Sequence, residues 1–219
     1  MTKFRLRIYQ DHLTEEVQAQ LPAQRRVLYC VAGCAEIKDA EKTETVKGDG
    51  AWFSAKATTV RGKDEGACIW RWELVTLDAP SGELKGEGII SRVAGDYEIE
   101  VDTSVKRLMR LDRVSFPLGG EALTHIHAAA GVRCLLEGNL LLDSVGHRYR
   151  VWPGDPWVEH GPDSVYAKAS EHQLSSFVRV MIVPEQYKGR STITYVNADD
   201  LEKPKSQSYK RYLEEPISL

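Results

Sequence analysis

Two histidines spaced two residues apart, His125 and His127, stand in the middle of a stretch that glycines bound at Gly119 and Gly138. On an extended strand, residues two apart project from the same face, with Cα atoms roughly 6.5 Å apart. Two imidazoles placed in this way can converge on one metal ion, although histidines at this spacing can also line a barrel wall without a metal. The pair Glu137-Gly138 predicts a tight turn after the next strand. The stretch therefore predicts neighbouring strands with a candidate metal site on one face.

The rest of the chain also has the pattern of an all-β protein. Among its 219 residues are 9 prolines and 17 glycines, which favours strands joined by turns. Residues 3–9 alternate basic and apolar side chains, and residues 68–76 form a β-prone run. Residues 26–37 are predicted to form two strands about a turn at Gly33. Residues 13–20 are predicted to form a short helical turn.

The second half of the chain repeats the order of the first. Residues 132–142 can be aligned with residues 27–37, and residues 177–183 with residues 69–75. These alignments place Gly138 on Gly33, Arg179 on Arg71, and the turn at Gly154-Asp155 on that at Gly48-Asp49. Three correspondences in one order indicate an internal duplication. A competing explanation is that any two all-β segments share Gly-Asp turns and apolar runs.

The duplication leads to a division of the chain into four parts. Residues 77–96 are richer in Gly, Pro, Ser and charge than their surroundings, which makes them the expected seam. We expect an N-terminal barrel over residues 1–80, a connecting segment over 81–105, a C-terminal barrel over 106–196 and a tail over 197–219.

The net charge and the cysteine content limit which binding partners and which cellular compartment are expected. The net charge is −3 with both signs mixed along the chain, so the sequence predicts neither nucleic-acid binding nor a basic membrane patch. The N-terminus has no apolar signal segment, and no stretch is long and apolar enough to span a membrane. The 4 cysteines are expected to be reduced packing thiols of a cytoplasmic protein.

The spacing around the histidines resembles the first motif of the cupin superfamily. That motif runs Gly, five residues, His-x-His, three or four residues, Glu, six residues, Gly. Gly119, His125, His127 and Gly138 stand at the matching places, but Gly131 stands where the Glu belongs. The whole chain resembles a bicupin, in which two double-stranded β-helix (jelly-roll) barrels arise from one duplicated unit.

The second cupin motif is matched only in part. It begins at Gly154-Asp155, but Val165 stands where its histidine is expected, and His160 stands where its proline is expected. The N-terminal half has no histidines at the places of His125 and His127. That half is therefore expected to be a barrel without a metal centre.

The resemblance implies one divalent transition metal per chain, namely Fe, Mn, Ni or Zn, held by histidines and often a carboxylate. Two imidazoles alone hold such an ion weakly, so a third protein ligand is expected. His160 is the predicted third ligand beside His125 and His127, because it follows the Gly-Asp turn closely. Glu121, Glu159 and Asp163 are rival candidates for the same role.

Arg133 is the predicted substrate-binding residue. It shares strand parity with Gly131, so its side chain is expected to point into the barrel. A buried guanidinium needs an anion, and it could hold a substrate carboxylate through two parallel hydrogen bonds. It could equally form an internal salt bridge to Glu137 or Asp143.

Three functions are compatible with these features. The first is a metal-dependent enzyme of oxygenase, isomerase or lyase type that acts on a small carboxylate-bearing molecule in the C-terminal barrel. The second is a non-catalytic bicupin that binds a small ligand at a degenerate metal site. The third is a structural pair of barrels that works through dimerisation. Exposed sheet edges and the long tail make a homodimer the expected assembly.

Overall fold

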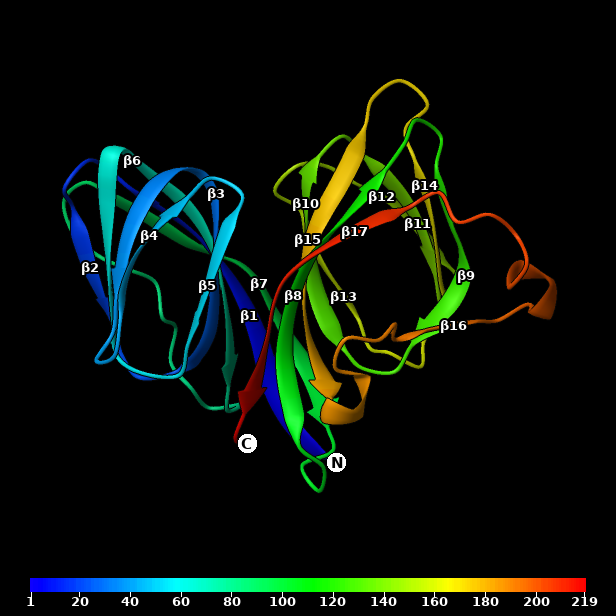
Figure 1. Cartoon of the computed structure of the whole chain (residues 1–219), viewed down its shortest axis with the longest axis horizontal. Coiled ribbons are helices and arrows are strands. Elements are labelled where there is room, and N and C mark those ends of the chain that lie inside the picture. Colours follow the sequence, from blue (N-terminus) through cyan, green and yellow to red (C-terminus); the bar gives the residue numbers. More distant parts are fainter. The chain divides into compact units, whose positions relative to one another are not determined.

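The computed structural model describes residues 1–219, which form 17 strands and two short 3-10 helices, so the predicted all-β fold class is confirmed (Figure 1). The chain divides into two compact units. The N-terminal unit is Lys3–Glu98, and the C-terminal unit combines Met1–Thr2 with Ile99–Leu219. No helix has the length and apolar character that crossing a membrane requires.

The N-terminal unit is built from one seven-stranded sheet. Its main order is β4-β3-β6-β1-β7, with β2 paired to β6 and β5 paired to β3. Its apolar interior is centred on Trp52, Leu28 and Ile69, which are almost completely buried. The strands are β1 (Thr2–Leu13), β2 (Gln18–Leu21), β3 (Arg25–Lys38), β4 (Thr43–Lys47), β5 (Gly50–Ser54), β6 (Thr58–Val75) and β7 (Ile89–Val101).

Two local predictions for the N-terminal unit are wrong. Residues 13–20 form no helical turn, because the end of β1 leads through a turn into β2. Gly33 does not separate two strands either: it is a bulge inside the continuous strand β3, with φ of 78°. A Cβ at Gly33 would lie 2.1 Å from the backbone oxygen of Gly66, so only glycine permits this close approach of β3 to β6.

The C-terminal unit contains two five-stranded sheets. Their orders are β13-β10-β15-β8-β17 and β12-β11-β14-β9-β16. The strands are β8 (Arg107–Phe116), β9 (Glu121–His127), β10 (Gly131–Glu137), β11 (Leu140–Ser144), β12 (His147–Val151), β13 (Pro156–Glu159), β14 (Val165–Ala169), β15 (Ser175–Pro184), β16 (Ile193–Tyr195) and β17 (Ser208–Ile217). The 3-10 helices are Glu185–Tyr187 and Ala198–Asp200.

The apolar core of the C-terminal unit draws on both of its sheets. Phe116, Trp157 and Phe177 come from the first sheet, and Leu140 and Leu142 come from the second. The rings of Trp157 and Phe177 meet edge to face with centroids 5.2 Å apart. The two sheets therefore face each other across a packed interior, which is the arrangement that positions the candidate site.

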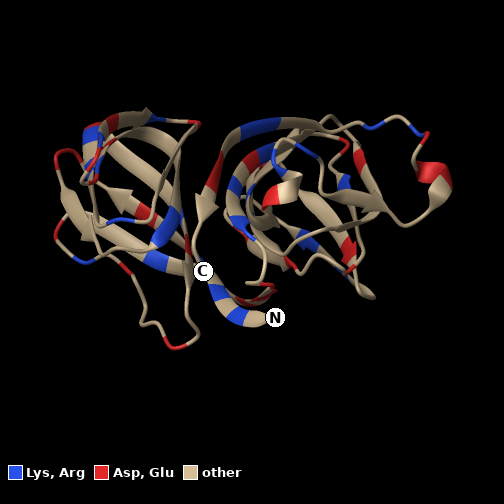
Figure 2. Ribbon diagram, turned by 60° about the horizontal axis from the view of Figure 1, so that its bottom comes forward, with Lys and Arg blue, Asp and Glu red and all other residues tan.

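The turn predicted at Gly138 is confirmed, since β10 ends at Glu137 and β11 begins at Leu140, with a φ of 75° at Gly138. Two other predicted segments contain strands. Residues 81–105 include β7, which pairs with β1, and residues 197–219 include β17, which pairs with β8. Figure 2 shows Lys and Arg as well as Asp and Glu scattered over both units.

Candidate metal centre

His125 and His127 lie on β9 and point into the interior of the C-terminal unit. Both side chains are buried, and their Nε2 atoms lie 3.2 Å apart. The rings meet edge to face, with centroids 4.8 Å apart and planes at 90°. The strand therefore brings two imidazole nitrogens to one point, as the spacing of two residues predicts.

The third group at this point is the carboxylate of Glu159, the last residue of β13. Its Oε2 lies 3.3 Å from His127 Nε2, and one ligand atom from each of the three residues lies within 4.8 Å of the others. Bonds of about 2.1 Å to a metal, at angles of about 90–110°, place neighbouring donor atoms roughly 3.0–3.4 Å apart. The two short donor separations fall in this range, and with the third within 4.8 Å a small side-chain movement would let all three residues contact one divalent ion.

Glu159 supplies the carboxylate that the cupin motif would place at Gly131. The two residues are direct cross-strand partners on β13 and β10. Gly131 itself has no room for a side chain, since a Cβ there would lie 2.7 Å from both the backbone oxygen of Val180 and Cγ of Met181. The carboxylate thus reaches the site from the neighbouring strand.

The structure does not bring His160, the predicted third ligand, to the imidazoles. Its side chain is exposed and lines a separate cavity of about 170 Å³ with Arg107 and residues 128–130. Neighbouring residues of an extended chain point to opposite sides, so only one side chain of the pair Glu159-His160 can face inward. Glu159 is the one that does, which makes this rival candidate the third potential ligand.

Glu121 and Asp163, the two remaining candidate ligands, lie away from the imidazoles. Glu121 is half-exposed with its carboxylate 3.7 Å from Lys168, and Asp163 does not join the group of potential ligands. Val165, at the place of the motif's histidine, is the cross-strand partner of His125 and presents an apolar side chain to the same cavity.

Each imidazole has a polar partner at Nδ1, and the partner of His125 is one that can only accept a hydrogen bond. Nδ1 of His125 lies 2.7 Å from the backbone oxygen of Leu123. A carbonyl only accepts, so in the neutral ring Nδ1 carries the proton and Nε2 presents its lone pair. Nδ1 of His127 lies 3.1 Å from Thr192 Oγ1. Burial lowers the pKa of His127 to about 3 and also lowers the pKa of His125, which keeps both rings in the neutral form that binds metals.

Glu159 is held as a carboxylate by two neighbours. Trp157 Nε1 donates a hydrogen bond to Oε1 at 3.0 Å, and Arg133 Nη2 lies 2.6 Å from Oε2. Burial alone would raise the pKa of Glu159, but the charge of Arg133 and the contact with His127 hold it well below its usual range. Oε2 accepts no hydrogen bond of acceptable geometry. This buried oxygen is therefore suited to a cation.

Arg133 occupies a different place from the one predicted for a substrate clamp. It is completely buried, and it is not among the residues that line the cavity beside the imidazoles. Nη1 donates to the backbone oxygen of Gly131 at 2.6 Å, and Nη2 pairs with Glu159 rather than with Glu137 or Asp143. The inward orientation is confirmed, but the side chain contacts a candidate metal ligand.

A second buried ion pair lies beside the first. Arg179 on β15 is the direct cross-strand partner of Arg133 on β10. Its Nε lies 2.5 Å from Asp112 Oδ1, and its Nη2 lies 3.2 Å from Asp112 Oδ2. The sequence patterns did not predict Asp112, Trp157 and Thr192 as supports of the site. For Trp157 a signal existed, because a Trp-x-Glu alternation after a Gly-Asp turn puts both side chains on one face.

The cavity at the candidate metal centre is small and mostly apolar. Its volume is about 30 Å³, which suffices for one or two water-sized groups at roughly 10–15 Å³ each. Its walls thus exclude bulk water from the three donor atoms. Its lining consists of Val114, Phe116, Ala122, His125, His127, Leu142, Trp157, Glu159, Val165, Ala167, Phe177, Arg179, Ile193, Gln207 and Tyr209.

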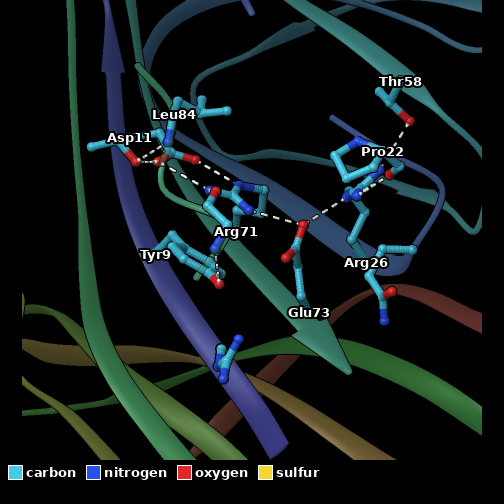
Figure 3. Close-up of polar contacts among 12 residues, drawn as sticks. Tyr9, Asp11, Pro22, Arg26, Thr58, Arg71, Glu73 and Leu84 are labelled. Atoms are coloured by element: carbon cyan, nitrogen blue, oxygen red, sulfur yellow. Dashed lines mark hydrogen bonds and ion pairs between the residues drawn. The ribbon is translucent and has the colours of Figure 1, made fainter. Parts of the chain in front are cut away.

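The N-terminal unit buries a closed network of ion pairs (Figure 3). Arg71 donates from Nε to Asp11 at 2.7 Å, and its Nη1 lies 2.8 Å from Glu73 Oε1. Arg26 donates to the same Glu73 oxygen at 2.9 Å. The arginines also donate to the backbone oxygens of Pro22 and Gly82. In residues 1–219, His125, His127 and Glu159 are the one group of three such side chains whose potential ligand atoms gather within 4.8 Å, and this group lies in the C-terminal unit.

No model of a protein family matches the sequence, and no curated protein matches it. Solved structures do match. Oxalate decarboxylase of Lactobacillus farciminis, as a formate complex, is 12% identical with a TM-score of 0.64 over 91% of this chain and 82% of that one. AerE from Microcystis aeruginosa is 10% identical, with a TM-score of 0.60 over 80% and 87% of the two chains. Procruciferin, an 11S globulin from Brassica napus, is 9% identical, with a TM-score of 0.61 over 86% and 78%.

These neighbours are cupin-fold proteins, and the chain therefore has the cupin fold. At such low sequence identity the structural similarity shows only the fold. Both enzymes and a globulin have this fold, so it does not indicate a function. Function must be argued from the buried group of His125, His127 and Glu159.

Proposed function

We propose that this chain is a metal-dependent cupin enzyme that acts on a small carboxylate-bearing molecule. One divalent transition metal, such as Fe, Mn, Ni or Zn, is held by His125, His127 and Glu159. The observation that carries the proposal is the convergence of two imidazole nitrogens and a carboxylate oxygen within 4.8 Å, all buried. Of the three atoms, Glu159 Oε2 accepts no hydrogen bond of acceptable geometry, and a cation would contact it together with the two imidazole nitrogens.

The metal would supply Lewis-acid or redox chemistry, with positions left open for ligands other than the protein. The protein residues do the rest. Leu123 and Thr192 orient the imidazoles, while Trp157 and Arg133 hold the carboxylate. The apolar walls of the cavity keep the donor atoms out of bulk water, which strengthens every charge interaction there.

The charge balance of the site favours an anionic substrate. The positive charges of Arg133 and Arg179 cancel the negative charges of Glu159 and Asp112, so a bound divalent ion would bring uncompensated positive charge into the interior. A small carboxylate would neutralise it, and the cavity of about 30 Å³ limits the size of the part that enters. Among the fold neighbours, an oxalate decarboxylase in complex with formate fits this substrate class. Oxygenase, isomerase and lyase reactions on such a molecule all fit the site, because the fold alone does not choose among them.

One observation favours a second candidate, a non-catalytic ligand-binding cupin. Arg133 already neutralises Glu159 across 2.6 Å, so the cluster is charge-balanced without a metal. In that case the protein would bind its ligand without turning it over. Substrate-dependent product formation from small carboxylates separates the two candidates.

The direct test of the proposed function is elemental analysis of protein prepared without added metal or chelator. The wild type is expected to contain at most one tightly bound metal per chain, and His125→Ala/His127→Ala to contain none while remaining folded. His147→Ala, on the exposed strand β12, is the matched control and should keep the metal. A double variant that retains metal would exclude this site, and so would a wild type that stays without metal when a divalent ion and a small carboxylate are supplied together.

We further propose that the two units are a duplicated pair, which would make the chain a bicupin. The support is in the strand pairing. Leu28 is opposite Arg71 in the N-terminal unit, and Arg133 is opposite Arg179 in the C-terminal unit, as the sequence alignment requires. A homodimer is proposed on the grounds of exposed sheet edges, and light scattering on the eluted protein would test it.

A further inference from the structure

Arg133 is placed to compete with a metal ion for Glu159. The guanidinium is completely buried, and its Nη2 lies 2.6 Å from Oε2 of Glu159. The same Oε2 lies 3.3 Å from His127 Nε2, on the side where the metal would bind. One carboxylate oxygen therefore faces two cationic positions, one permanently filled by the arginine.

Arg133 cannot withdraw easily. Its Nη1 is held by the backbone oxygens of Gly131 at 2.6 Å and Glu159 at 3.5 Å. On the other side its direct cross-strand partner is Arg179, itself a cation engaged by Asp112. A fixed positive charge thus remains beside the site whether or not a metal is present.

This fixed charge changes the binding properties of the site. Two neutral histidines and one carboxylate would normally offer a divalent ion one negative charge. Here Arg133 already neutralises it, and like charges in a buried, weakly screened site repel strongly. The protein alone is a poor host for a bare divalent ion, although its donor geometry fits one.

A small anion would remove this penalty. The cavity beside the donor atoms has room for one or two water-sized groups, and Arg179 is one of its walls. An anion bound there would lie next to the open metal positions and would lower the positive charge of the site by one unit. A group the size of a carboxylate matches both the charge and the volume.

We propose that Arg133 makes metal binding conditional on a small carboxylate, so that metal and anion bind to His125, His127 and Glu159 as a coupled pair. This inference rests on the proposed function. It adds a condition for metal binding, namely that the site fills with metal only when its substrate-like anion is present. The coupling is reciprocal, so the anion binds tightly only to the metal-loaded protein.

The test is a titration of the metal-free protein with Co²⁺, with binding read from calorimetry and from the visible absorption of the bound ion. It is run in millimolar sodium formate and in sodium chloride of equal ionic strength, because formate is a small carboxylate that binds free Co²⁺ weakly. Wild-type protein is expected to bind Co²⁺ at least about tenfold more tightly in formate, a typical size for coupling between two sites.

Variants of Arg133 provide the second arm. Arg133→Met removes the charge and keeps an unbranched apolar side chain, so it should bind Co²⁺ in chloride at least about tenfold more tightly than wild type, with most of the formate effect lost. Arg133→Lys keeps the charge and should keep the formate effect. Arg110→Met is the matched control, because Arg110 is a buried arginine on β8 that pairs with Glu214, and it should behave as wild type.

Each result decides between named possibilities. Equal Co²⁺ affinity of wild type in formate and chloride overturns the coupling while leaving the proposed metal site intact, and this arm needs no variant to fold. Weaker binding by Arg133→Met shows that Arg133 only positions Glu159 and does not compete. Absence of Co²⁺ binding in both salts, with wild type matching His125→Ala/His127→Ala, removes the proposed function itself.

Discussion

The two units bury the same kinds of charged side chain, but the buried glutamate has different partners in each. Each interior network contains two arginines and two carboxylates, namely Arg26, Arg71, Asp11 and Glu73 in the N-terminal unit and Arg133, Arg179, Asp112 and Glu159 in the C-terminal unit. In the first network Glu73 Oε1 contacts two guanidinium groups. In the second network Glu159 Oε2 faces one arginine and one imidazole, with a cavity beside them.

The pairing register locates the difference at one position. Arg26 is opposite Ser54 and Glu73, whereas Gly131 is opposite Glu159 and Met181. Under the duplication proposed above, the N-terminal unit has an arginine at the place where the C-terminal unit has a glycine. Filling the position closes the network, and leaving it empty gives Glu159 a free side. The proposed metal site depends on this oxygen of Glu159, which lies beside a cavity and not between two arginines.

The largest effect is expected from breaking the closed network. Arg71→Met leaves Asp11 and Glu73 buried without their shared cation, and removing one partner of a buried pair costs about 3–5 kcal/mol. Urea denaturation should show this loss in the free energy of unfolding. Arg61→Met, which breaks a half-exposed pair with Glu36, should cost less than about 1 kcal/mol. Equal decreases in the free energy of unfolding for the two variants would show that the buried network stabilises the protein no more than the half-exposed pair does.

The next effect concerns the open network. Glu159→Gln keeps the shape and can still accept from Trp157, but it removes the one anionic ligand. Affinity for Co²⁺ in formate should fall by about 100-fold or more, since ligand loss should exceed the 10–100-fold that outer contacts cost. Calorimetry measures it. His160→Ala is the paired variant and should bind as wild type, because His160 lies on another cavity. A large loss for His160→Ala would restore the ligand predicted from sequence.

A smaller effect is expected at Gly131, the position used above to compare the two units. Gly131→Ala places a Cβ 2.7 Å from the backbone oxygen of Val180, which a rotamer change cannot relieve. Such overpacking costs about 1–3 kcal/mol in the free energy of unfolding. In Gly48→Ala the nearest atoms lie 3.7 Å away, so thermal unfolding should shift little. Full stability of Gly131→Ala would show that the surrounding atoms leave room for a side chain at this position.

The smallest effect is expected from the thiols of the N-terminal unit. Burial raises the pKa of Cys30 to about 12, so this thiol stays protonated and unreactive at mildly alkaline pH. Cys68 is the least buried of the four cysteines and should react first with iodoacetamide under native conditions. Mass spectrometry locates the label, and elemental analysis should find the metal retained. Metal release on alkylation would indicate that a thiol of the N-terminal unit is a metal ligand, contrary to the proposed site.

Much of the architecture could be predicted from the sequence, because strand alternation and glycine turns are local signals. The convergence of the paired histidines and the turn at Gly138 both followed from spacing. The third ligand did not. Choosing Glu159 over His160 requires knowing where β13 ends, and a shift of one residue reverses which side chain faces inward.

The remaining errors have a similar cause. Gly33 reads as a turn because glycine supports both turns and bulges, and only the approach of Gly66 from a distant part of the chain decides between them. The role of Arg133 depends on a partner supplied by another strand. Local pattern gives the direction of a side chain, whereas its partner is a property of the assembled sheet.

Strand β17 has a consequence for the order in which the site is assembled. Gln207, just before it, and Tyr209, within it, line the cavity, and the strand reaches its place by pairing with β8. That pairing closes a loop from Phe116 to Ser208 and is more remote in sequence than the contact between β9 and β14, so it is expected to form late. The imidazoles can therefore be gathered while one wall of the cavity is still missing. An order of folding in which β17 docks last would leave the donor atoms open to water and ions until that strand is in place.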